Sequence, residues 1–123
     1  MTTIAFIGGG NMASAILGGL IENGYDSQSI FVSDPSQEKL DELAKQFNIN
    51  TNSNNETVIA QADVVILAVK PQVMQQVISP LKSALDKKKP LIISVAAGIS
   101  LESLSTWTSA ELSIVRCMPN TPA

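Results

Sequence analysis

Hydrophobic positions along this chain fall into two kinds of segment. Short, continuously apolar runs occupy residues 4–7, 30–32, 64–69, 91–93 and 112–115. Runs of this length are typical of β-strands, and the lack of polar alternation indicates strands that are buried on both faces. The pattern therefore predicts a parallel sheet that is covered by helices on each side.

The segments between these runs have helical periodicity. We expect helices over residues 11–23, around 40–47, in a short stretch after the capping box SNNE at 53–56, over 71–85, and over 101–107. Gly24 is placed as a C-terminal cap, Pro71 suits a first helical position, and Ser53 and Ser100 are placed as N-caps. Strands that alternate with helices predict right-handed crossovers and a doubly wound, mostly parallel sheet in a three-layer α/β/α domain.

Composition narrows the function further. A chain of 123 residues with 45% hydrophobic and 15% charged residues suits one compact domain. Its net charge of -3 argues against nucleic acid or a membrane surface as a partner, because both are polyanionic. A single cysteine and no histidine leave no basis for Ser-His-Asp hydrolysis or a metal site. No apolar run is long enough to span a bilayer, so we expect a cytoplasmic protein.

A glycine-rich turn carries the strongest chemical signal. Residues 8–13, GGGNMA, satisfy the G-x-G-x-x-A pattern between a predicted strand and a predicted helix. Gly8 would permit the tight turn, Gly10 would let the backbone approach a pyrophosphate, and Ala13 would allow close helix packing. A turn that serves packing alone is the alternative. The context favours a Rossmann-type dinucleotide site with the pyrophosphate at the helix N-terminus.

Asp34 ends the second predicted strand and has two interpretations of equal weight. Its carboxylate is placed to accept hydrogen bonds from an adenosine ribose, which would favour NAD because a 2'-phosphate would be repelled. Alternatively, with Pro35 and Gln37 after it, Asp34 is a good N-cap for the next helix. The neighbouring Ser33 could instead donate a hydrogen bond to a 2'-phosphate.

Two later turns also follow predicted strands. Ala68 to Pro71 and Ala96 to Gly98 lie at strand ends, where open α/β sheets bind ligands. Their small residues would let a nicotinamide ring lie against the backbone, whereas Lys70 is more typical of a solvated charge. Cys117 has no partner base and is expected to be a small buried hydrophobe.

Several segments together resemble one enzyme family. They are FIGGGNM at 6–12, AILGGL at 15–20, AVKP at 68–71, VAAG at 95–98 and RCMPNTP at 116–122. In this order they are similar to the N-terminal domain of the pyrroline-5-carboxylate reductases, which reduce a cyclic imine to L-proline. The resemblance covers essentially the whole chain.

The resemblance implies a set of site residues. Those implied or considered for the cofactor are Ile7, Gly8, Gly9, Gly10, Asn11 and Met12 at the pyrophosphate, Ser33, Asp34 and Asn54 at the adenosine, and Ala68, Val69, Lys70, Pro71, Val95, Ala96 and Ala97 beside the nicotinamide. Asn120 and Thr121 would lie toward the substrate. NADP(H) is the implied cofactor, with NAD(H) second, because Asp34 stands where the family often has serine or threonine.

The family also implies a larger enzyme. Its members continue into a helical domain that forms a dimer or higher homo-oligomer and supplies the substrate pocket, which this sequence does not contain. We therefore expect the chain to bind cofactor with little turnover, and no catalytic residue is assigned. Two alternatives stay open: the N-terminal half of another NAD(P) dehydrogenase, such as a β-hydroxyacid dehydrogenase or a coenzyme F420-dependent NADP reductase, and a non-catalytic dinucleotide-binding module.

Overall fold

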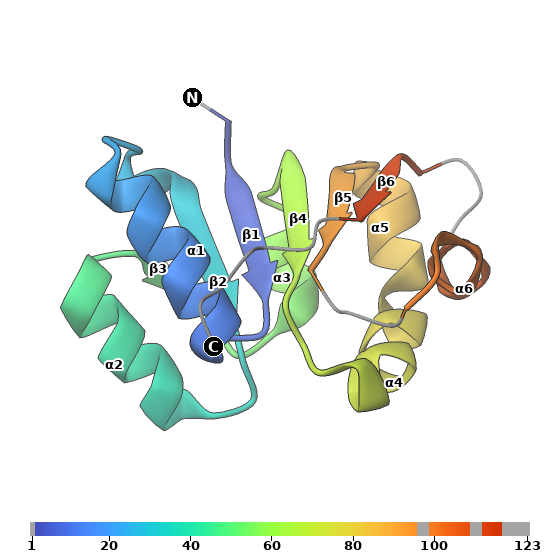
Figure 1. Ribbon diagram of the computed structural model, residues 1–123, viewed down its shortest axis with the longest axis horizontal. Helices are drawn as coiled ribbons and strands as arrows, with labels where there is room; N and C mark the ends of the chain where they lie inside the picture. The colour runs from blue at the N-terminus through green and yellow to red at the C-terminus, as the bar shows by residue number, and fades with distance from the viewer. Residues whose placement is uncertain (1, 96–98, 109–111, 117–123) are drawn as a thin grey trace.

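The computed structural model describes residues 2–95, 99–108 and 112–116. Within them, six strands form one sheet in the order β3-β2-β1-β4-β5-β6, with every neighbouring pair parallel. The strands are β1 (Ile4–Ile7), β2 (Ile30–Ser33), β3 (Asn50–Thr51), β4 (Val64–Leu67), β5 (Leu91–Ser94) and β6 (Ile114–Arg116). Because all strands run the same way, their carboxyl ends meet at the lower edge in Figure 1.

Helices cover both faces of this sheet. The front layer in Figure 1 holds α1 (Asn11–Glu22) and α2 (Gln37–Phe47), and the back layer holds α3 (Asn55–Ile59), α4 (Met74–Ile78), α5 (Lys82–Lys88) and α6 (Leu101–Trp107). Short 3-10 helices η1 (Ser27–Ser29), η2 (Pro71–Val73) and η3 (Ser79–Leu81) complete the described part. The predicted doubly wound parallel sheet with three layers is confirmed.

Each layer packs through its own apolar cluster. Phe6 of β1 joins Leu17 and Leu40 in the front cluster, whereas its neighbour Ile7 joins Met74 and the back cluster. Successive strand residues point to opposite faces, so a sheet covered on both sides needs apolar residues at every position. This explains why the strands read as continuous apolar runs.

The prediction of one long helix over residues 71–85 is wrong. The structure divides this segment into η2, α4 and η3, and α5 follows from Lys82. Pro80 lies within η3 and explains the break, because proline has no amide hydrogen and its ring clashes with the carbonyl four residues earlier. The apolar stripe nevertheless stays on one side, since Met74, Ile78 and Leu85 all join the back cluster.

Two predicted caps have different outcomes. Gly24 ends α1 with φ +95°, and the N–H groups of Gly24 and Tyr25 donate to the carbonyls of Ile21 and Leu20, as in a Schellman motif. This cap is confirmed. Ser53 is not the cap of α3; Asn54 is, and its Oδ1 accepts a hydrogen bond from Thr57 N–H over 3.1 Å.

Strand ends also differ in detail from the sequence pattern. The run at 64–69 leaves the sheet after Leu67, and β6 begins at Ile114 rather than at residue 112. The pattern missed β3 because it has only two residues, Asn50 and Thr51, which are polar. No helix in the described part combines the length and the apolar character that crossing a membrane requires.

Candidate functional site

The turn after β1 requires glycine at its first position. Gly8 has φ +103°, and its N–H donates a 2.8 Å hydrogen bond to the carbonyl of Ser33 at the end of β2. An ideal Cβ on Gly8 would lie 3.0 Å from the carbonyl oxygen of Ala68 and from Cγ1 of Val69. Both the backbone angle and the close approach therefore exclude a side chain, as the glycine pattern predicts.

Asp34 is bound to the same turn. Its Oδ2 accepts a 2.8 Å hydrogen bond from Gly9 N–H in a buried position, and its Oδ1 accepts one of 2.8 Å from Ser36 N–H. The predicted N-cap role of Asp34 is wrong. Ser36 caps α2 and accepts a hydrogen bond from Lys39 N–H, while Asp34 lies two residues before the cap and joins it to the glycine turn.

Ser33 faces inward at the end of β2. Its side chain is fully buried, and its hydroxyl donates a hydrogen bond to Oδ1 of Asn55, the first residue of α3. The hydroxyl proton is therefore engaged within the protein. Ser33 and Asp34 together connect the end of β2 to α3 and to the turn after β1.

The start of α1 is open. Gly10 is its N-cap residue and provides no side-chain hydrogen bond, and an ideal Cβ on Gly10 would meet nothing within 4 Å. The first amides of an α-helix have no intrahelical acceptor, and together with the helix dipole they attract anions. A glycine turn with an open Cβ position and free amides fits a pyrophosphate group.

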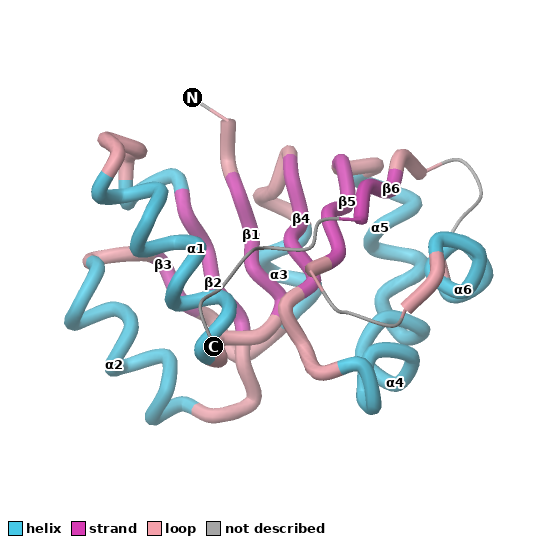
Figure 2. Tube along the Cα trace, in the orientation of Figure 1, coloured by secondary structure: helices cyan, strands magenta, loops and turns pink. Residues whose placement is uncertain are grey.

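A groove of about 360 Å³ lies at this helix start. It is lined by Gly9, Gly10, Asn11, Ser14, Lys39, Glu42, Leu43, Gln46 and Lys70. The loops after β1, β2 and β4 come together at one edge of the sheet (Figure 2), and Gly9, Gly10 and Lys70 of these loops line the groove. The exposed Lys39 and Lys70 bring positive charge to a groove whose one acidic lining residue is Glu42.

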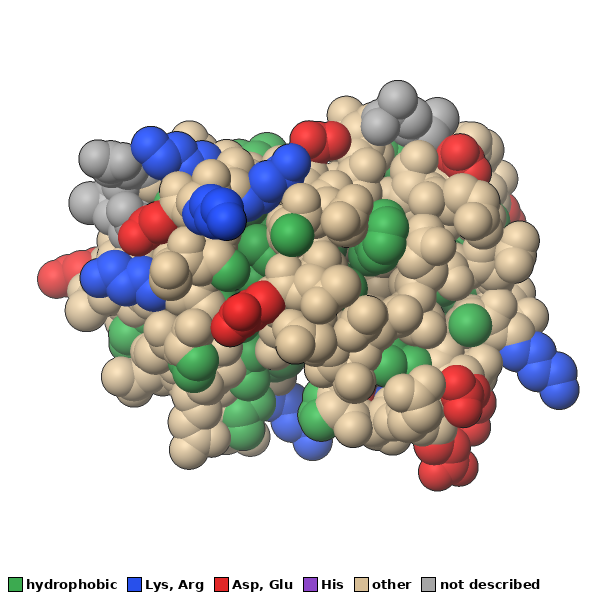
Figure 3. Space-filling model, turned by 180° about the vertical axis from the view of Figure 1, so that it is seen from behind, with side chains coloured by type: hydrophobic (Ala, Val, Ile, Leu, Met, Phe, Trp, Pro, Cys, Tyr) green, Lys and Arg blue, Asp and Glu red, His purple; other side chains and the backbone are tan. Residues whose placement is uncertain are grey.

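A larger groove of about 600 Å³ lies in the back layer and is less suited to a cofactor. Its lining residues are Glu56, Ala60, Ser83, Ala84, Lys87 and Lys88. Figure 3 shows Lys and Arg side chains gathered at the upper left of this back face, and Lys87 and Lys88 at the C-terminal end of α5 line the groove. No strand end and no glycine turn lines this groove, so we place the candidate site at the smaller one.

The other residues expected at the nicotinamide side follow β4 and β5. Ala68 and Val69 are half-buried, and Ala68 N–H donates a 2.9 Å hydrogen bond to the carbonyl of Ile7. Val95 follows β5, and its N–H donates to the carbonyl of Leu67. Ile7, Ala68 and Val95 thus lie at the ends of three adjacent strands, where backbone groups can face one ligand.

Some expected residues lie elsewhere or are not described. Asn54 is exposed at the start of α3, Pro71 is exposed after Lys70, and Met12 packs partly against the front cluster. Ala96, Ala97, Gly98, Cys117, Asn120 and Thr121 lie outside the described residues. Within the described ranges, no three His, Cys, Asp or Glu side chains gather into a group that could hold a metal ion.

Sequence reasoning missed part of the groove. Ser14 lies one turn after Gly10, and Lys39, Glu42, Leu43 and Gln46 have the i, i+3, i+4, i+7 spacing of one helix face. That spacing is visible in the sequence. What it does not show is that α2 lies beside the start of α1 at the glycine turn.

Known proteins support this assignment. A pyrroline-5-carboxylate reductase of Haemophilus influenzae is 52% identical over 120 residues, which cover 98% of this chain and 44% of that protein. The solved pyrroline-5-carboxylate reductase of Coxiella burnetii has a TM-score of 0.94 and 44% identity, covering 98% of this chain and 45% of its own. The resemblance seen in the sequence is confirmed. The chain spans less than half the length of these relatives.

A more distant structure contains a cofactor. The pyrroline carboxylate reductase of Plasmodium falciparum, solved with NADP bound, has a TM-score of 0.83 and 30% identity over 98% of this chain and 43% of its own. A family model described as NADP oxidoreductase, coenzyme F420-dependent, matches residues 3–98. This match includes the glycine turn and all of the described groove. The chain therefore belongs to the family of NADP oxidoreductases described as coenzyme F420-dependent.

Proposed function

We propose that this chain is the cofactor-binding part of a pyrroline-5-carboxylate reductase. It would bind NADP(H) and present the nicotinamide for hydride transfer to the cyclic imine 1-pyrroline-5-carboxylate, giving L-proline in proline biosynthesis. The observation that carries the proposal is the open start of α1, where Gly10 leaves its Cβ position empty beside unpaired helix amides. The identity to reductases over 98% of the chain favours this enzyme over other dehydrogenases that share the glycine turn.

Each part of the groove has a role in the proposal. The amides of Gly10, Asn11 and Met12 would donate hydrogen bonds to the pyrophosphate, and Lys70 would offset its charge. Asn54, exposed at the start of α3, would contact the adenosine. Ala68 and Val69, with Pro71 and Val95 to Ala97, would lie beside the nicotinamide. The bound cofactor supplies the hydride, and the chain holds and orients it.

A second region would complete the enzyme. The reductases similar to this chain are more than twice as long as the part it covers. Leu91 is 37% and Val115 48% exposed, and both lie on the face of the sheet that carries Ile93 of the front cluster. We propose that a further region packs there, forms the homo-oligomer and builds the substrate pocket, with Asn120 and Thr121 toward the imine. Hydride transfer needs the imine held over the nicotinamide, so this chain alone should turn over little.

The test is a titration of the chain with NADPH and with NADH, followed by nicotinamide fluorescence. Gly10→Ala is the decisive variant, because the new methyl group would enter the groove without touching the protein. Gly19→Ala is the matched control, since it also adds a methyl group in open space on α1, but away from the groove.

We expect the wild type and Gly19→Ala to bind NADPH equally well. Gly10→Ala should bind at least about tenfold more weakly, the loss expected when about 1.4 kcal/mol of contact is removed. Its melting temperature should fall only slightly, because alanine is a poorer N-cap residue than glycine. Equal binding by Gly10→Ala, or no binding of either cofactor by the wild type, would refute the proposed site.

A further inference from the structure

Asp34 is a buried carboxylate with two backbone partners in different segments. It is only 8% exposed, and its Oδ2 and Oδ1 accept hydrogen bonds from Gly9 N–H and Ser36 N–H, each 2.8 Å long. The bond to Gly9 joins residues 25 positions apart. It connects the turn after β1 to the loop that leads from β2 into α2.

A second aspartate shows which of these bonds is unusual. Asp26 caps η1 and accepts a 3.0 Å hydrogen bond from Gln28 N–H, the same local bond to residue i+2 that Asp34 makes with Ser36. Asp26 is exposed, lies before β2 rather than after it, and has no described bond to a distant segment. The long-range bond to Gly9 is therefore not part of the local turn that an aspartate normally makes.

The bond divides the amides of the glycine turn into two groups. Gly8 N–H donates to the carbonyl of Ser33, and Gly9 N–H donates to the carboxylate of Asp34. The last residue of β2 and the residue after it therefore bind two successive amides of the turn. The amides that remain for a ligand begin at Gly10. Because glycine backbone is intrinsically mobile, these two bonds restrict the direction in which the following amides point.

Burial leaves the carboxylate little access for a ribose. A ribose hydroxyl would have to reach a side chain that is 92% covered and whose two oxygens already accept charge-assisted bonds from buried or half-buried amides. We infer that Asp34 is a positioning residue for the cofactor turn, which it holds through Gly9, and that it does not select between NADPH and NADH. This inference rests on the proposed cofactor function of the turn.

The test compares Asp34→Ala and Asp34→Asn with Asp26→Ala. Asp26→Ala removes the same charge and the same local bond but leaves Gly9 untouched. Asp34→Asn keeps one side-chain oxygen that can accept the Gly9 amide without the charge. Two properties are measured for each variant at a temperature where it is folded: hydrogen exchange of the Gly9 amide by NMR, and the affinities for NADPH and NADH.

We expect Gly9 exchange to accelerate at least about tenfold in Asp34→Ala, less in Asp34→Asn, and not at all in Asp26→Ala. Affinity for both cofactors should fall by about tenfold in Asp34→Ala, with the NADPH-to-NADH ratio changed by less than about threefold, and Asp34→Asn should recover part of the loss. A purely structural role would lower stability and leave the affinities of the folded protein unchanged.

Besides unchanged affinities in the folded Asp34 variants, two further results would overturn the inference. One is a Gly9 amide that exchanges at the wild-type rate in both Asp34 variants. The other is a selective gain in NADPH affinity in Asp34→Asn, which would mean that the carboxylate faces the ribose. Should the wild type bind neither cofactor, the proposed function fails, and the Gly9 exchange still decides whether Asp34 holds the turn.

Discussion

An ideal Cβ on Gly8 would lie 3.0 Å from the carbonyl oxygen of Ala68. The two residues follow β1 and β4, which are neighbours in the sheet with Ile7 opposite Leu67. The proposed pyrophosphate turn and the proposed nicotinamide turn therefore touch through a position where a side chain is absent. Any residue other than glycine at position 8 would push these two turns apart.

Replacing Gly8 by alanine should destabilise the protein more than replacing Gly24. Both glycines have positive φ, +103° and +95°, but an added Cβ would meet nothing within 4 Å at Gly24. Gly24→Ala should cost about 1–2 kcal/mol of unfolding free energy from backbone strain alone. Gly8→Ala should cost about 1–3 kcal/mol more from the contacts with Ala68 and Val69. Urea unfolding measures both, and equal losses would contradict the role of the close approach.

Gly19→Ala should stabilise α1. Gly19 lies inside the helix with open space around its Cβ position, so alanine should raise the unfolding free energy by about 0.5–1 kcal/mol. At the adjacent Gly18, an added Cβ would lie 3.4 Å from the ring of Phe47. The gain at Gly18 should therefore be smaller. Thermal melts of the two variants give the comparison, and a destabilised Gly19→Ala would contradict it.

Asn54 should have separable effects on stability and on binding. Asn54→Ala removes the hydrogen bond to Thr57 N–H and should cost about 1 kcal/mol of stability, as the loss of an N-cap usually does. Asn54→Ser keeps a capping oxygen and should restore most of that stability. If the amide contacts the adenosine, both variants bind NADPH more weakly than the wild type. Full affinity in Asn54→Ser would remove Asn54 from the proposed site.

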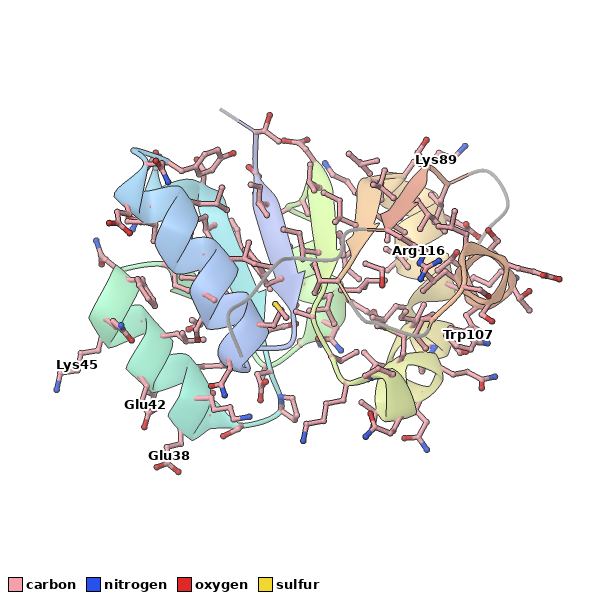
Figure 4. All side chains as sticks on the ribbon, in the orientation of Figure 1. Glu38, Glu42, Lys45, Lys89, Trp107 and Arg116 are labelled. Atoms are coloured by element: carbon pink, nitrogen blue, oxygen red, sulfur yellow. The ribbon has the colours of Figure 1, made fainter. Side chains whose placement is uncertain are left out.

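Lys70 should contribute to cofactor affinity through charge. Lys70→Gln removes a cation from the groove and should weaken NADPH binding about threefold at low salt, with a smaller difference at high salt because screening reduces the attraction. Lys45→Gln is the control, since Lys45 points outward from α2, away from the sheet (Figure 4), and does not line the groove. Fluorescence titrations at two salt concentrations test this, and equal effects of the two variants would indicate only a loss of net charge.

Most of the fold could be predicted from local pattern. The apolar runs located five of the strands. They missed β3, because this strand has only two residues and both are polar. The break at Pro80 was also visible in the sequence, because a proline interrupts a helix wherever it occurs in the interior. The cap of α3 was displaced by one residue because Asn52 Oδ1 accepts the Asn54 N–H and places Asn54 at the helix start.

The glycine turn is the part of the site that the sequence determined by itself. The tight turn between a strand and a helix needs a residue that tolerates φ +103°, and glycine at position 8 does. The first amides of the helix that follows have no intrahelical partner in any such arrangement. These properties depend on residues adjacent in the chain. Local periodicity and local backbone preference are sufficient to predict them.

Tertiary structure alone decided which distant residue Asp34 contacts. Ribose contact and helix capping were the two interpretations of its sequence position, and its long-range hydrogen-bond partner, Gly9, is 25 residues away. The bond exists because the register between β1 and β2, with Ile7 opposite Ser33, brings the residues after each strand together. Likewise, Lys39 lines the groove only because α2 packs beside α1. The partner of a polar side chain depends on which strands and helices become neighbours, and the packing of the whole sheet determines those neighbours.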